Sequence, residues 1–249
     1  MTRRYIALLA GALCAMPLTA GCMGSGPPLV VGELVTRTEA VPRTGVTMLD
    51  VTVELGIGEI AIGGGAEAAL DAEFRYNVAE WKPVFEKTER GDVTSVTISQ
   101  PDTESGNIGS DVEYSWKIDL PDDIPCRLEL DVGVGESVID LAGVDIDELS
   151  IDAGVGSVDL SLRGVSSDDL TVAIDGGVGE IHVHVPEEQG VRVKGDTGIG
   201  EFRAAGLRTS GSYLVNDAYE RNGKGIEITI NAGIGEIVVD TKEQGKARA

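Results

Sequence analysis

Apolar and polar residues alternate along most of this chain, and the alternation changes phase at a recurring glycine motif. In the stretch 149–162, LSIDAGVGSVDLSL, apolar residues occupy odd positions up to Val155 and even positions from Val158 onwards. Side chains of a strand alternate between its two faces, so each copy is predicted to be two strands joined at a bulge or corner. Glycine would supply the positive φ there. The six triplets are Gly56-Ile57-Gly58, Gly133-Val134-Gly135, Gly154-Val155-Gly156, Gly177-Val178-Gly179, Gly198-Ile199-Gly200 and Gly233-Ile234-Gly235.

The triplets recur with a period near 21 residues in the second half of the chain. From the second to the fifth they are spaced by 21, 23 and 21 residues, and the sixth follows after 35. A fixed period with strand patterning is typical of a solenoid, in which successive units stack and their corners lie over one another. We therefore predict an all-β fold with a β-solenoid over 121–242, about 21 residues per repeat. The longest interval carries an insertion, and we expect a surface loop over 210–225.

Residues 41–120 are predicted to be a β-rich portion ahead of these repeats. Alternation is clear over 47–57, and the stretch 66–76 has helical propensity but strand-like alternation, which favours a strand. Six aromatic residues gather here, and we expect a small aromatic core closing one end of the sheet; the alternative is an exposed platform for a glycan or a partner chain. These residues are Phe74, Tyr76, Trp81, Phe85, Tyr114 and Trp116.

The first 21 residues have the pattern of a signal peptide. Arg3 and Arg4 precede an apolar run that is too short to span a bilayer. The following Leu18-Thr19-Ala20-Gly21-Cys22 resembles the lipobox of bacterial lipoproteins, which implies cleavage before Cys22 and lipidation of that cysteine. The alternative is an ordinary secretory signal with a chance cysteine. Residues 22–40 are predicted to be a tether, and because Met23 follows the cysteine, the outer membrane is the expected location if the cell has one.

Charge and cysteine content narrow the class of protein further. The formal net charge is −22, and without residues 1–21 the chain keeps 18 basic and 42 acidic residues. Such a surface repels nucleic acid and anionic headgroups. We therefore expect no nucleic acid partner, and we expect the protein to be held at the membrane by its lipid anchor alone. Cys14 leaves with the signal and Cys22 carries lipid, so Cys126 has no partner for an internal disulfide. Its strand-like surroundings indicate a buried, unreactive thiol.

Two columns of acidic residues flank the central residues of the triplets. Stacked units would bring like charges within about 5 Å, which destabilises a sheet unless something offsets the repulsion. The carboxylates could accept hydrogen bonds from backbone N–H groups of the glycine turns and otherwise be solvated, or they could form a row of weak Ca²⁺ sites. One column is Glu54, Asp131, Asp152, Asp175, Asp196 and Asn231; the other is Glu59, Glu136, Ser157, Glu180, Glu201 and Glu236.

Other candidate sites are weak. Gly56 to Ala61 fits the dinucleotide fingerprint GxGxxA, but a strand pattern follows it where that motif requires a helix. His182 and His184 could form a metal pair, yet no third ligand is apparent, and both are expected to face solvent. An enzyme acting on polysaccharide would need basic residues converging with acids on one face. Candidates are Arg163, near a turn, and Arg192, Lys194 and Arg203, expected close together in one rung; solvated charge is the preferred explanation.

The segment Val53 to Pro83, with ELGIGEIAIGGGAEAAL, FRYN and WKP, resembles the N-terminal part of the toast-rack family. The segment WKIDLPDDIP, followed by LELDVGVGESVIDL, is similar to the toast-rack and putative-adhesin β-solenoids of bacterial envelopes. Related domains sit in membrane proteins that respond to cell-wall-active antibiotics, and the family has no established catalytic residues.

We therefore expect a lipid-anchored, non-enzymatic binding or assembly module of the cell envelope that is linked to envelope stress sensing. No catalytic residue, metal or cofactor is expected. Its partner would be an envelope protein or glycan. The alternatives are an adhesin-like protein that self-associates through exposed end strands or binds a surface, and a polysaccharide-acting β-helix enzyme.

Overall fold

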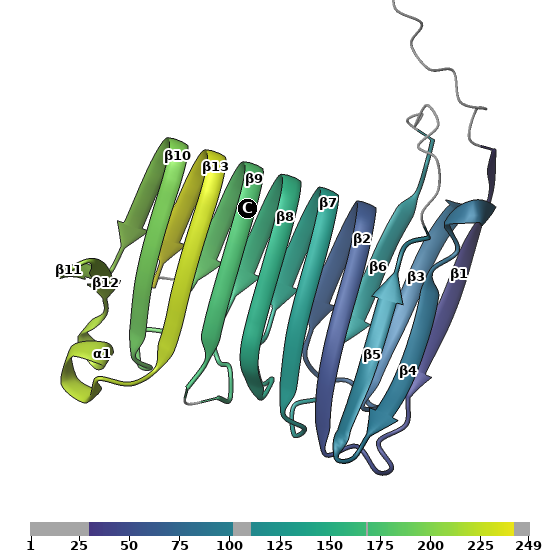
Figure 1. Ribbon diagram of the computed structural model, residues 1–249, viewed down its shortest axis with the longest axis horizontal. Coiled ribbons are helices and arrows are strands. Elements are labelled where there is room, and N and C mark those ends of the chain that lie inside the picture. Colours follow the sequence, from purple (N-terminus) through teal and green to yellow (C-terminus); the bar gives the residue numbers. More distant parts are fainter. Residues whose placement is uncertain (1–29, 102–110, 168, 242–249) are drawn as a thin grey trace, which may run out of the picture.

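The computed structural model describes residues 30–101, 111–167 and 169–241, and all the strands in these ranges lie in one mixed β-sheet (Figure 1). The fold is therefore all-β, as predicted. Its strands are β1 (Val31–Val41), β2 (Met48–Gly63), β3 (Leu70–Val78), β4 (Val84–Arg90), β5 (Val93–Ser99), β6 (Tyr114–Asp119), β7 (Cys126–Asp140), β8 (Ile146–Ser161), β9 (Thr171–His184), β10 (Val191–Ala205), β11 (Arg208–Ser210), β12 (Tyr213–Val215) and β13 (Ile226–Asp240). Two short helices, η1 (Ala79–Trp81) and α1 (Asp217–Asn222), complete the fold.

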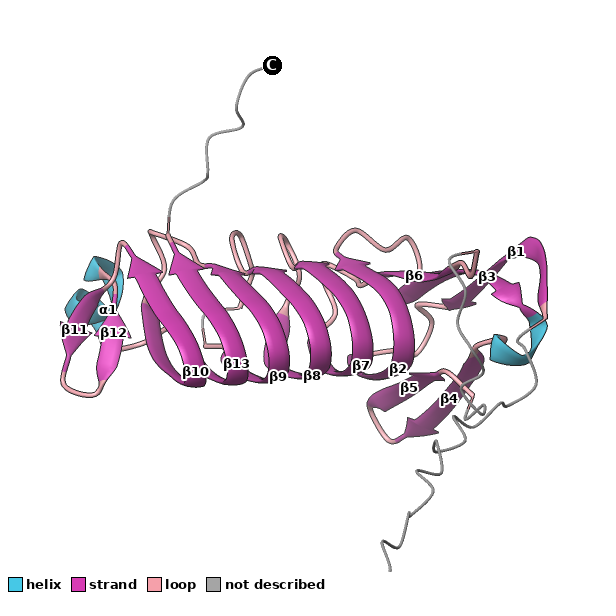
Figure 2. Ribbon diagram, turned by 90° about the horizontal axis from the view of Figure 1, so that it is seen from above, coloured by secondary structure: helices cyan, strands magenta, loops and turns pink. Residues whose placement is uncertain are grey.

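Six long strands form the stack that the repeats predict. They pair in parallel in the order β2, β7, β8, β9, β13, β10, and each folds over at its glycine triplet (Figure 2). The central residues of all six triplets lie in register from strand to strand. The prediction that the corners coincide is confirmed.

Glycine is required at the corners because neighbouring strands approach more closely there than a side chain permits. Gly156 has φ +148°, in the region that favours glycine. A Cβ on Gly156 would overlap the carbonyl oxygen of Gly135 in the preceding strand, and a Cβ on Gly154 would overlap that of Gly133. The glycines of the triplet therefore have two roles: they allow each strand to fold over, and they allow neighbouring strands to approach closely.

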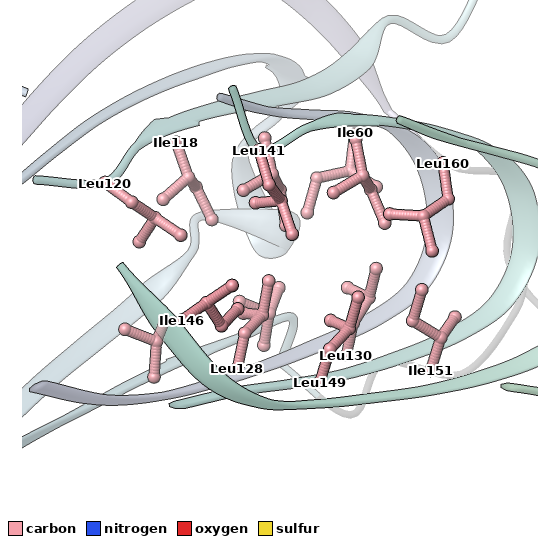
Figure 3. Close-up of a cluster of buried hydrophobic side chains, with 14 of the residues drawn as sticks. Ile60, Ile118, Leu120, Leu128, Leu130, Leu141, Ile146, Leu149, Ile151 and Leu160 are labelled. Carbon is pink, nitrogen blue, oxygen red and sulfur yellow. The ribbon is translucent and has the colours of Figure 1, made fainter. Parts of the chain in front are cut away.

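The core lies between the two halves of the folded strands (Figure 3). Leu128, Leu149 and Ile151 come from first halves, while Ile60 and Leu160 come from second halves, and each is at most 2% exposed. Full burial of such a side chain stabilises the fold by about 1.5–3 kcal/mol. The change of phase at each triplet thus keeps the apolar residues of both halves pointing into one core.

At the β2 end the two layers continue as separate strands. The first half of β2 pairs with β5, which pairs with β4, and its second half pairs with β6, followed by β3 and β1. Residues 31–40, which the sequence analysis placed in the tether, form most of β1 and pair antiparallel with β3. The strand expected within 66–76 is present from Leu70 onwards.

Aromatic side chains fill this end of the core, as expected. Trp116 packs edge-on against Phe74 at a centroid distance of 5.5 Å, and Trp81 packs edge-on against Tyr114 at 5.4 Å. The Tyr114 hydroxyl donates a hydrogen bond to the carbonyl oxygen of Trp81 at 2.7 Å. All four rings are at most 6% exposed, so they form no exposed platform.

The order of the last strands differs from the expected succession. β13 lies between β9 and β10, pairing in parallel with both, so the sixth triplet is the fifth in space. The insertion before β13 is not only a loop: it contains the short strands β11 and β12 and the helix α1. This segment carries the chain out past β10 and back, which leaves room for β13 to enter the stack.

Asn216 fixes the insertion to the turn between β9 and β10. Its side chain is 3% exposed and caps α1 by accepting from the Tyr219 N–H at 2.9 Å. The same amide oxygen accepts from the Val191 N–H at 3.0 Å, and its nitrogen donates to the Gln189 carbonyl at 2.7 Å. One buried side chain thus satisfies backbone groups from two segments.

We expect Asn216→Ala to destabilise the protein by about 3 kcal/mol, because it leaves buried backbone groups without partners. The free energy of unfolding from urea titrations would measure this. Asn222→Ala, at the exposed end of α1, is the control and should change it by less than about 0.5 kcal/mol. Equal effects of the two substitutions would contradict the role assigned to Asn216.

Candidate interaction surface

A row of apolar side chains runs along the corners of the stack; five of them are exposed and the sixth, Ile57, is half-buried. We call it the corner ridge; in spatial order it consists of Ile57, Val134, Val155, Val178, Ile234 and Ile199. Val155 is 51% exposed and Ile199 is 68% exposed. The folded strands turn away from the core at this point, so no opposing layer covers the five exposed side chains, whereas Ile57 packs against the core at the β2 end. The corners of the six long strands, where the ridge residues lie, form the upper edge of the stack in Figure 1.

Acidic residues stack in register on both sides of the ridge, as the repeats predict. The Asp row is Glu54, Asp131, Asp152, Asp175, Asn231 and Asp196, and the Glu row is Glu59, Glu136, Ser157, Glu180, Glu236 and Glu201, both in spatial order. Nearly all of these carboxylates are exposed. The corner is therefore an apolar line between two lines of negative charge.

Most carboxylates of the two rows are exposed to solvent, and a neutral or basic side chain reduces the repulsion at one point of each row. Asn231 lies between Asp175 and Asp196 and donates a hydrogen bond to Asp175 at 2.8 Å. At the end of the Glu row, Arg203 contacts both Glu201 and Glu236 and lowers the pKa of Glu201 through its hydrogen bond. Among the described residues, no backbone N–H of the glycine corners donates to the Asp row, and no three acidic, histidine or cysteine side chains are grouped to hold a metal ion. The Ca²⁺ hypothesis gains no support.

The two histidines do not both face open solvent. The side chain of His184 is 17% exposed and lies between two carboxylates, with Nδ1 3.0 Å from Asp240 and Nε2 3.2 Å from Asp159. Arg163 contacts the other oxygen of Asp240 at 2.6 Å. These contacts join β8, β9 and β13, so the expectation of a solvated histidine is wrong for His184, and its nearest groups give it a structural role.

The basic residues of β10 do not converge on one site. Arg192 pairs with Glu227 at 2.6 Å, and its guanidinium lies over the Tyr213 ring at 4.5 Å. Arg203 lies in the other half of the strand with the acids of the Glu row. Arg192 and Lys194 lie two residues apart in the first half of β10, so the expectation that all three lie close together is wrong for Arg203 alone, because the strand folds between it and the other two.

Cys126 is buried, as predicted, and its Sγ contacts the carbonyl oxygen of Ile124 at 3.1 Å. Burial raises the pKa of its thiol from 9.0 to about 12. The neutral thiol is therefore favoured in the folded state, and the stability it contributes is complete below pH 9 and is lost as the pH rises towards 12.

We expect Cys126 to resist alkylation by iodoacetamide at pH 8 while the protein is folded. Its raised pKa lowers the thiolate fraction on the order of a thousandfold, and burial hinders access further. Peptide-resolved mass spectrometry would follow its modification, with the guanidinium-unfolded protein as the control. Modification of native Cys126 at the rate of the unfolded chain would contradict this assignment.

A second group of exposed apolar side chains lies on the corner side of the molecule. It comprises Val30, Val31, Leu34 and Val35, at the start of β1, each at least 41% exposed. Val35 pairs with Tyr76, which pairs with Tyr114, and the Tyr114 carbonyl lies beside Gly58 at the corner of β2. The described chain therefore begins on the side of the molecule that carries the corner ridge (Figure 1).

The structure tests the prediction for the GxGxxA motif but not the predicted lipidation site. Gly56 to Ala61 lies within β2, so the strand expected after this motif is present and the dinucleotide site is not formed. Cys22, the predicted lipidation site, lies outside the described residues. None of the described helices is long and apolar enough to cross a membrane.

The sequence analysis did not identify the ridge as a surface. Its central residues continue the parity of the buried residues before them, and alternation alone gives no sign of where the opposing layer ends. Their position between two glycines is the signal that could have revealed it.

The chain matches two family models. One is described as the N-terminal domain of toast_rack, DUF2154, and covers residues 30–184; the other is described as cell wall-active antibiotics response LiaF, C-terminal, and covers residues 143–239. No curated protein matches the chain.

Solved structures give a similar result. A putative cell adhesion protein from Clostridium sporogenes is 29% identical, with a TM-score of 0.78 over 84% of this chain and 100% of that one. A putative adhesin from Bacteroides fragilis is 13% identical over 83% and 97% of the two chains, and its TM-score of 0.35 adds no argument.

Proposed function

The chain belongs to the family of the N-terminal domain of toast_rack, and on that premise we propose that it is a lipid-anchored, non-enzymatic module of the bacterial cell envelope. It would bind another envelope component through the corner ridge and take part in sensing envelope stress. The observation that carries this proposal is the ridge itself: six aligned apolar side chains, five of them exposed, along a well-packed stack. A contiguous exposed apolar surface with polar residues along its rim is typical of an interaction site.

The comparisons support an envelope role. The LiaF C-terminal model, described by a response to cell wall-active antibiotics, matches the repeats, and the similar Clostridium structure is described as a putative cell adhesion protein. Neither description names an enzyme.

The position of the chain start supports anchoring near the ridge. From Cys22 to Val30 the backbone can extend over at most about 28 Å. Because β1 starts on the corner side, lipidation of Cys22 would hold the corner ridge close to the bilayer. The negative charge of the two rows opposes direct contact with anionic headgroups, which leaves the ridge available to a partner at the membrane surface.

Two measurements test this proposal. Membrane fractionation should find the protein with the membrane and its Cys22→Ser variant released from it. Crosslinking in envelope preparations should capture the same component with the wild-type chain and lose it with the triple variant Val134→Ser, Val155→Ser, Val178→Ser. Capture that is unaffected by the triple variant would refute binding through the ridge.

One observation favours self-association as a second function. Of the described strands, only β12 pairs with the outer edge of β10, and it reaches only Arg192 and Val193. The remainder of that edge presents free backbone groups that another strand could pair with. Sedimentation that depends on protein concentration, and that is reduced by Thr197→Pro, would support this function; a monomer at all concentrations would remove it.

A further inference from the structure

The corner ridge and its two acidic rows form one amphipathic surface whose dimensions can be compared with those of a ligand. Parallel strands lie about 4.8 Å apart, so six ridge residues extend over about 24 Å. The Asp and Glu rows run beside the ridge over the same length. A partner that fits must present an apolar stripe with cationic groups on both sides, repeated at nearly the same spacing.

We propose that this surface binds a cationic amphipathic α-helix of about 16 residues, because a helix rises by about 1.5 Å per residue and 16 residues therefore extend over about 24 Å. The inference rests on the proposed function and specifies its partner. Side chains one turn apart on a helix are spaced by about 5.4 Å, close to the strand spacing, whereas alternate residues of an extended chain are about 6.7 Å apart and fall out of register. The helix spacing therefore favours one residue of its apolar stripe per strand.

The negative charge of the two rows favours a helix with basic residues on both sides of its apolar stripe. Lysine or arginine on either side of the apolar stripe would face the Asp row and the Glu row, whose carboxylates are mostly free of ion pairs. Arg203 is the exception, and it occupies only the β10 end of the Glu row. A bilayer is a poorer occupant, because the side chains beside the ridge are acidic and would be repelled by anionic lipid.

The test uses a fluorescein-labelled Lys/Leu/Ala peptide of about 18 residues with a leucine stripe flanked by lysines, titrated with the full chain carrying Cys22→Ser. That substitution removes the acyl anchor, which would by itself recruit the protein to vesicles. A scrambled peptide of the same composition, an alternating Lys-Leu peptide and vesicles of anionic lipid form the other arms. We expect the amphipathic helix to bind at least about tenfold more tightly than either other peptide.

Protein variants separate the contributions of the ridge and the rows. Val134→Ser with Val155→Ser and Val178→Ser should weaken binding at least about tenfold, and Glu136→Gln with Glu180→Gln and Glu236→Gln should weaken it similarly and reduce its salt dependence. The matched control removes three exposed acids elsewhere, Glu129→Gln, Glu187→Gln and Glu188→Gln, and should change affinity less than about twofold.

Several outcomes would overturn the helix proposal: equal binding of the scrambled peptide, preference for the alternating peptide, recruitment to vesicles without peptide binding, or equal loss with the control variant. Ridge-dependent capture of an envelope component together with no peptide binding would refute the helix and leave the proposed function intact. Loss of ridge dependence in both experiments would remove the two together.

Discussion

Gly156→Ala is expected to destabilise the protein by about 4 kcal/mol or more, enough to unfold much of the stack. The new methyl group would overlap the carbonyl oxygen of Gly135, and φ at this position is +148°. β7 has no freedom to retreat, because β2 pairs with it on the far side in the same register. Gly179 of β9 approaches the Gly156 carbonyl in the same manner, so a shift of β8 would transfer the strain to the next strand.

Two further substitutions separate the steric clash from the backbone conformation. Gly177→Ala places a methyl against the Gly154 carbonyl at a position whose φ is not positive, so it tests the clash alone. Gly45→Ala has φ +82° but open space around the new methyl, and it should cost about 1 kcal/mol. Far-UV circular dichroism is the appropriate probe, because both tryptophans lie outside the six long strands, in β6 and η1. A nearly neutral Gly177→Ala would show that the corners are loosely packed.

The glycine period made the stack predictable, and local chemistry explains why. Each triplet changes the parity of burial, and a shift of pairing by one residue would expose the core, so the sequence dictates the register of every corner. The strand order was not predictable in the same way. The spacing between Gly177 and Gly198 equals that between Gly133 and Gly154, yet β13 separates the first pair in space. Parallel strands with the same pattern are nearly interchangeable, and only distant contacts such as those of Asn216 distinguish them.

Of the candidate surface, too, one part could be predicted from the sequence and another could not. Repetition at fixed offsets from the triplets was sufficient to predict the stacked acidic rows. The exposure of Val155 was not apparent, since parity describes a face and not whether another layer covers it. His184 lies on the predicted face, but Asp240, one of the two acids that enclose it, is 56 residues away in sequence. Its environment therefore depends on where β13 enters the stack.

Removal of β13 is expected to have the second large effect. In a chain that ends at Gly225, β10 loses its parallel partner over its whole length, and His184 and Arg163 lose Asp240. Hydrogen exchange followed by mass spectrometry should find that protection over 191–205 falls by at least about a hundredfold, while β7 and β8 retain theirs. The core around Leu130 and Leu149 does not contain β13, which is why these strands should remain folded.

A chain that ends at Thr241 is the control, because it keeps every described strand and should exchange as the full chain does. The truncation also decides whether β13 is needed to order β10. β9 and β10 carry the same triplet pattern, so in the absence of β13 they could pair directly with each other. If residues 191–205 keep their protection in the chain that ends at Gly225, then β9 and β10 pair directly with each other. In that case β10 does not need β13 to be ordered, and β13 lies between β9 and β10 because it fits that place slightly better than other strand edges.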